Sequence, residues 1–149
     1  DTKMDNGMTV GEYAKATMLD EIERAVILCN KADEYDVPAL TDDEEKQCAS
    51  KAEDYMASIG EDIATQFSVE QSAVLAIYEK DALSMKVYNQ ILENLSETLR
   101  QEDDYKDMED NEFEQVLNDK FEEQYAQWKD TCKVETTETW EQLVIGAVG

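Results

Sequence analysis

The chain of 149 residues contains no histidine, one proline, five glycines, three cysteines and two arginines. Without histidine, neither a Ser-His nor a Cys-His nucleophile pair can be assembled, and the usual general base near neutral pH is missing. A zinc site of mixed cysteine and histidine ligands is excluded for the same reason, and the cysteine spacing matches no all-cysteine zinc pattern. The absence of histidine therefore argues against most hydrolytic and metal-dependent enzymes.

Phosphate-binding motifs are missing too, since the sequence has neither a G-x-x-x-x-G-K loop nor a G-x-G-x-x-G turn. The best calcium candidate, residues 103–114, lacks the central glycine and the alternating acids of an EF-hand loop. Carboxylates are abundant, but among 37 of them any catalytic pairing arises by chance. We therefore predict a protein that is not an enzyme and that uses no cofactor and no metal.

Positive charge is scarce, because 13 Lys and Arg stand against 37 Asp and Glu and give a formal net charge of −24. Such a field repels nucleic acid and anionic lipid and attracts basic surfaces. No apolar run is long enough to cross a membrane. We expect a soluble chain without direct nucleic-acid binding or membrane insertion, whose partner is a basic protein surface, such as that of a nucleic-acid-binding protein.

With so few glycines and prolines, the chain suits long helices joined by short loops. Thr9 with Glu12 and Thr41 with Glu44 form capping boxes, and Ser68 with Gln71 is a third expected cap. Apolar residues at helical spacing then predict helices over about 10–35, 42–67, 69–101 and 110–132. A bend is expected at Gly60 and a kink at the polar stretch 79–81.

The predicted fold is all-α: one domain over 1–149, shaped as an antiparallel four-helix bundle with a short extra segment at its C-terminal end. Residues 1–8 are expected to be a flexible lead-in, 102–112 an acidic connection and 136–149 the C-terminal segment. That last segment is either a short helix begun near Thr136 or Thr137 or an extended tail. The oligomeric state stays open.

Cys29 and Cys48 lie nine or ten residues on either side of the turn expected at Pro38 and Ala39. In an antiparallel hairpin they would sit at the same height and face each other, as a disulfide requires. Such a bond would close a loop of roughly 20 residues, worth about 3 kcal/mol, and would indicate an oxidising compartment. The alternative is two reduced cysteines packed as small hydrophobes. Localisation therefore stays open between export, with a signal removed before Asp1, and the cytoplasm.

The acids concentrate in two segments. Asp43, Asp54 and Glu61 are spaced 11 and 7 apart, which places them on one helical face, and residues 102–123 hold 11 acids against two lysines. We predict an acidic partner-binding face that comprises Asp43, Asp54, Glu61, Asp103, Asp104, Asp107, Glu109, Asp110, Glu112 and Glu114. In charge and size the chain is similar to proteins that inhibit nucleic-acid enzymes by imitating DNA, a likeness of composition that rests on no residue motif.

Two alternatives stand beside this hypothesis. The acids are a solvated surface that only keeps the protein dissolved, or the chain is an exported helical binding or inhibitor domain stapled by Cys29–Cys48. In the second case its apolar contacts would come from Trp140, Leu143 and Val144, which follow the last long helix. Trp128 is expected in the core, since it falls in phase with the apolar stripe of the helix over 110–132.

Overall fold

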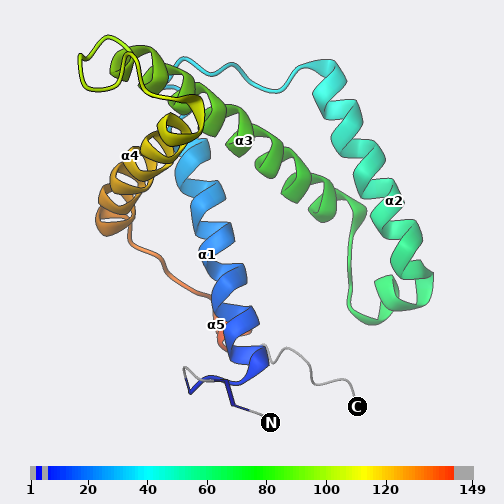
Figure 1. The fold of residues 1–149 in the computed structure, drawn as a ribbon. Helices are drawn as coiled ribbons and strands as arrows, with labels where there is room; N and C mark the ends of the chain where they lie inside the picture. Colours follow the sequence, from blue (N-terminus) through cyan, green and yellow to red (C-terminus); the bar gives the residue numbers. More distant parts are fainter. Residues whose placement is uncertain (1–2, 5–6, 143–149) are drawn as a thin grey trace.

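The computed structural model describes residues 3–4 and 7–142, and its regular structure is helical (Figure 1). The helices are α1 (Val10–Asn30), α2 (Asp42–Gln66), α3 (Gln71–Leu99), α4 (Asp110–Thr131) and the short α5 (Glu138–Gln142). Outside them, the described residues contain one isolated bridge, between Lys3 and Thr9. The predicted all-α, bundle-like fold is confirmed. None of the helices within the described residues is long and apolar enough to span a membrane.

Both threonine capping boxes form as predicted. Thr9 Oγ1 accepts the amide of Glu12 at 3.2 Å, and the Glu12 carboxylate accepts the amide of Thr9 at 2.8 Å. Thr41 and Glu44 make the same exchange at 3.3 and 2.7 Å. These bonds satisfy amides that the first turn of a helix leaves without an internal partner, so each helix begins where its threonine stands.

The cap expected at Ser68 is wrong. Ser68 adopts a left-handed backbone conformation with a φ of 52°, and the N-cap of α3 is Glu70, which makes no side-chain capping bond. The left-handed residue ends α2, since L-residues do not continue a right-handed helix in that conformation. The chain therefore turns at Ser68, and α3 starts at Gln71.

The two expected helix irregularities have different outcomes. Gly60 interrupts α2 with φ 77° and ψ 162°, so the predicted bend is confirmed. No kink forms at residues 79–81, and α3 runs without a break through this polar stretch. The difference is physical: glycine permits a left-handed backbone conformation, whereas charged side chains leave the helical hydrogen bonds unchanged.

The core lies where the C-terminal half of α1, the middle of α3 and most of α4 meet. Phe121 and Val87 are fully buried there, and the Tyr88 ring packs edge-on against Phe121 at 4.8 Å. Trp128 is buried as predicted, with Tyr35 against its ring edge. The complete cluster of buried residues is Ile27, Leu28, Val37, Val87, Ile91, Phe121, Tyr125 and Trp128.

Each of α1, α2 and α4 packs on α3, and α1 and α2 share no extended interface (Figure 1). The expected Cys29–Cys48 disulfide is therefore not formed, and Cys29, Cys48 and Cys132 are free thiols. The Cys29 thiol donates instead to the carbonyl of Lys80 on α3 at 3.2 Å, and burial raises its pKa. Cys48 is buried in α2, which among the described helices packs extensively on α3 alone. The hairpin that the prediction assumed does not exist, because both helices lie on α3.

Ion pairs join the helices around this core. Lys86 of α3 reaches the Glu44 carboxylate at the start of α2 at 2.8 Å and the carbonyl of Ala39 at 3.3 Å. Arg24 of α1 pairs with Glu122 of α4 at 2.7 Å, which raises the pKa of the guanidinium. The hydrogen bond from Lys86, together with those to Thr41, lowers the pKa of Glu44 to about 2. Glu44 thus caps α2 and ties it to α3.

Replacement of Phe121 by alanine is expected to lower the free energy of unfolding by about 3–5 kcal/mol, because it removes a fully buried ring and leaves a cavity. The matched control is Phe67→Ala, since Phe67 is 64 % exposed and should change stability by less than about 0.5 kcal/mol. Urea unfolding followed by circular dichroism measures both. Equal effects of the two substitutions would place the core elsewhere.

Acid is expected to weaken the α2–α3 attachment through Glu44. A carboxyl whose pKa is lowered in the folded state contributes stability above its unfolded pKa, and this contribution is lost as the pH falls. For Glu44 the loss should run from about pH 4.5 down to about pH 2. Glu44→Gln should therefore be less stable than the wild type at neutral pH, with a difference that shrinks across this window. Thermal unfolding at a series of pH values tests it, and a difference constant with pH would contradict it.

Candidate acidic interaction site

Arg100 organises the connection between α3 and α4. It follows the last residue of α3, and its Nη1 atom donates to the carbonyls of Tyr105 at 3.0 Å and Met108 at 2.8 Å. Its Nη2 atom pairs with the Asp110 carboxylate at 3.0 Å, and its guanidinium lies 3.8 Å from the centre of the Phe113 ring. One planar cation thus folds the connection back onto the start of α4, a task that suits the fixed fork of arginine.

The backbone held in this way presents eight acidic side chains, all of them exposed. We call this set the acidic end: Glu102, Asp103, Asp104, Asp107, Glu109, Asp110, Glu112 and Glu114. Asp103 pairs with Lys106 at 2.7 Å and Asp110 with Arg100. The other six form no ion pair with any described residue, so the acidic end keeps most of its negative charge.

Asp110 and Glu112 lie in the first turn of α4. Negative side chains are favoured there because the helix N-terminus carries a partial positive charge and unpaired amides. Beneath them, Phe113 is buried and anchors the helix start. The acids of the acidic end are therefore displayed on a backbone that Arg100 and Phe113 fix from below.

The acids of α2 do not join this surface, so the single acidic face predicted from the sequence is divided in two. Asp43, Asp54 and Glu61 are exposed, and Asp43 pairs with Lys46 at 3.4 Å. The ion pair between Glu44 and Lys86 sets the start of α2 beside the middle of α3. Arg100 lies 14 residues beyond Lys86, which corresponds to about 21 Å along a helix.

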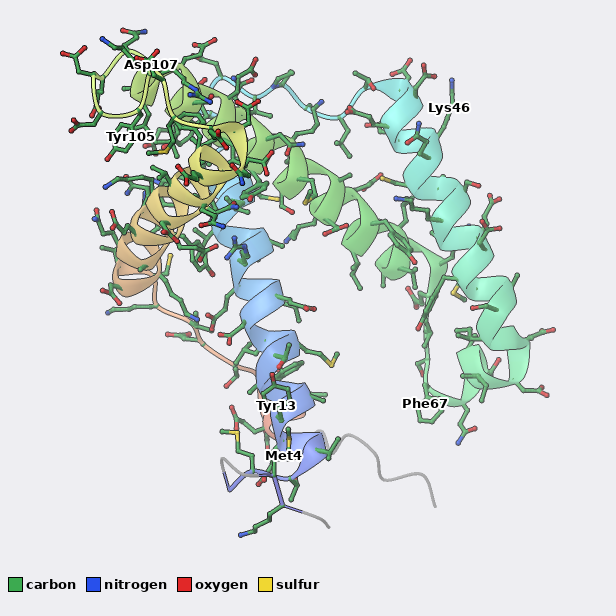
Figure 2. The ribbon with its side chains drawn as sticks, in the orientation of Figure 1. Met4, Tyr13, Lys46, Phe67, Tyr105 and Asp107 are labelled. Carbon is green, nitrogen blue, oxygen red and sulfur yellow. The ribbon has the colours of Figure 1, made fainter. Side chains whose placement is uncertain are left out.

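Figure 2 shows the same separation, with Lys46 at the start of α2 and Asp107 and Tyr105 on opposite sides of the view. From its start, α2 continues away from the acidic end toward the beginning of α3. Asp54 and Glu61 consequently lie even further from Asp107 than Asp43 does. The structure brings together the seven predicted residues between 103 and 114 and separates them from the three on α2.

Of the three residues predicted to make an apolar contact, Trp140 lies near α1. Trp140 is half-buried in α5, with the Lys15 ammonium 5.7 Å from the centre of its ring, and Lys15 also donates to the carbonyl of Glu141 at 3.1 Å. Thr137 accepts the amide of Trp140 at 3.2 Å, so the short helix begins near Thr137, as one of the two expectations had it. Leu143 and Val144 lie outside the described residues.

Arg100 is the residue that sequence reasoning missed. From the sequence it was counted only as one of two arginines, although its position two residues before a run of acids is a usable signal. Its main partners are backbone carbonyls, which no side-chain pattern reveals. Among the described residues, no cluster of three or more acidic or cysteine side chains is arranged to hold a metal ion.

Comparison with known proteins returned no match to a protein-family model, to a curated protein or to a solved structure.

Arg100→Lys is expected to loosen the acidic end while keeping its charge, because lysine cannot span two carbonyls and a carboxylate at once. Amides of residues 101–109 should exchange faster with solvent, and the free energy of unfolding should fall by about 1–3 kcal/mol. The control is Lys106→Arg, a conservative change of the exposed cation in the same segment. Indistinguishable exchange in the two variants would show that Arg100 does not hold the connection.

Proposed function

We propose that the protein is a non-enzymatic binding protein whose acidic end meets a basic surface of a partner protein. The observation that supports this is the fixed display of eight exposed acids, six of them without an ion-pair partner among the described residues, on a connection that Arg100 holds in place. A purely solvating surface needs no such fixed backbone.

The fixed backbone favours binding for a thermodynamic reason. When a partner binds a flexible acidic loop, the binding free energy must offset the conformational entropy that the loop loses on ordering. A preorganised loop has already lost this entropy before binding. The net charge of −24 adds long-range attraction, which raises the association rate with a basic partner and falls as salt screens it.

The partner that this surface suits best is a nucleic-acid-binding protein. Clefts that bind nucleic acid are lined with Lys and Arg that neutralise closely spaced phosphates. The acidic end offers closely spaced carboxylates on a protruding connection (Figure 2), as an inhibitor that imitates DNA would need. With the Cys29–Cys48 bond absent, the exported, disulfide-stapled alternative loses the feature that motivated it.

Removal of charge at the acidic end should weaken such binding. Core histones bound to a short DNA duplex serve as the basic probe, and the measurement is the protein concentration that releases half of the duplex. Asp104→Asn, Asp107→Asn and Glu114→Gln together should raise this concentration about fivefold to tenfold, since each exposed charge contributes about 0.3–0.5 kcal/mol. The release should also weaken as salt rises from about 0.05 to about 0.2 M.

The matched control removes three exposed charges from α2 with Glu53→Gln, Asp54→Asn and Glu61→Gln. It has the same net charge as the triple variant of the acidic end and should release the duplex within about twofold of the wild type. If the two triple variants are equally weakened, the acidity acts as a uniform solvated surface and the proposal fails. Circular dichroism checks that both variants keep the helical fold.

A further inference from the structure

A groove lies between α1 and α3, away from the acidic end. It has a volume of about 480 Å³, and its walls are Glu21, Arg24, Ala25 and Leu28 of α1 and Asp81, Ser84, Met85 and Tyr88 of α3. Leu28 and Ser84 are buried at its base, whereas Met85 at its edge is 50 % exposed. The groove begins where the two helices cross, shares Leu28 with the core cluster and lies away from the acidic end.

The apolar lining continues along both helices beyond this crossing. On α1, residues 14, 18, 21, 25 and 28 alternate by four and three positions, so Met18 shares the face that lines the groove. On α3, residues 77, 81, 84 and 88 follow the same spacing and place Ile77 on the lining face. Met18 is 44 % exposed and Ile77 is 68 % exposed, although both fall on packing stripes.

These side chains are exposed because the helices diverge. Figure 1 shows the N-terminal half of α1 leading away from the crossing on one side and α2 with the start of α3 on the other. Tyr13 and Phe67, labelled in Figure 2, lie on these separate parts and are both exposed. Each stripe has the heptad spacing by which a helix packs against a neighbouring helix, and beyond the crossing no described helix fills that position.

The charge of the groove decides which partner fits it. Its walls contribute two carboxylates, Glu21 from α1 and Asp81 from α3, and neither forms an ion pair with any described residue. The one cation of the lining is Arg24, whose guanidinium is held by Glu122 at 2.7 Å and lies over the rings of Phe121 and Tyr125 on α4. An apolar floor with two unneutralised acids is complementary to a helix that is apolar on one side and basic at its edge.

We infer that the groove between α1 and α3 binds a cationic amphipathic helix of a partner, with its apolar side on Met18, Ile77 and Met85 and a Lys or Arg at Glu21 and Asp81. This is the helix-in-groove mode of recognition, in which apolar residues at helical spacing supply the affinity. Flexible methionine side chains suit such a surface, since they adapt to the shape of the incoming helix. The inference does not depend on the acidic end.

The probe is a helical peptide of about 14 residues made of leucine and lysine, with leucines at helical spacing on one side. Nuclear magnetic resonance of the methionine methyl groups reports where it binds, because Met85 lines the groove, Met18 lies on the α1 face that continues it, and Met108 stands between Asp107 and Glu109 of the acidic end. The signals of Met18 and Met85 should shift on titration. A second peptide with glutamate in place of lysine should bind at least about tenfold more weakly.

Two variants separate charge from apolar contact. Glu21→Gln with Asp81→Asn should weaken the affinity for the lysine peptide about threefold to fivefold. Ile77→Gln should weaken it about fivefold without any change of charge and keeps both methionine reporters. The matched control is Asp104→Asn with Asp107→Asn, which removes the same charge from the acidic end and should leave the Met18 and Met85 titration within about twofold of the wild type.

Three outcomes would overturn the inference. Shifts of Met108 alone would place the peptide on the acidic end, and equal binding of the glutamate peptide would remove the role of Glu21 and Asp81. A dimer in sedimentation whose dissociation on dilution shifts Met18 and Met85 would identify a second copy as the occupant. None of these outcomes contradicts histone release by the acidic end, so the two proposals fail separately.

Discussion

The fold depends on the packing of α1, α2 and α4 against one helix, α3. Because α1 and α2 share no extended interface, the largest buried cluster lies where α1 and α4 meet the middle of α3, around Phe121 and Val87, while α2 buries only small side chains such as Cys48 and Ala52. Apolar residues on stretches that leave this meeting point, such as Val10 on α1 and Phe67 after α2, are left exposed by the helices that the structure describes. One central helix thus accounts for both the small core and the exposed apolar side chains.

Because Lys and Arg are few, ion pairs stabilise the fold at only a few places. Eight of the 13 cations form ion pairs among the described residues, and the pairs that join different helices lie at the packing contacts: Arg24 with Glu122, Lys86 with Glu44, and Lys129 with Asp20 and Glu23. These pairs bring helices together where like charges would otherwise repel. Few cations then remain for the other acids, which is why the acidic end keeps its charge.

Local features of the fold followed from the sequence, and long-range ones did not. Thr9, Thr41 and Gly60 act through their own backbone and its next few residues, so their effects could be predicted from their positions. The Cys29–Cys48 disulfide required α1 and α2 to pack on each other. The equal spacing of the two cysteines from Pro38 cannot show whether the apolar faces of these helices pack on each other or on α3. The acids from Asp103 to Glu114 were visible as composition, whereas the clamp by Arg100 was not, because it acts on the carbonyls of Tyr105 and Met108.

The acidic end and the groove differ in how far they depend on the core. The contacts that hold the acidic end are local: Arg100 bonds to residues within ten positions of itself and stacks on Phe113. The exposed carboxylates of the acidic end can therefore be replaced with little effect on the packing of α3. The groove shares Leu28 and Ser84 with the buried crossing of α1 and α3, so its shape is set by the same contacts that stabilise the fold. Charge can vary at the first surface, whereas the second requires the helices to cross as they do.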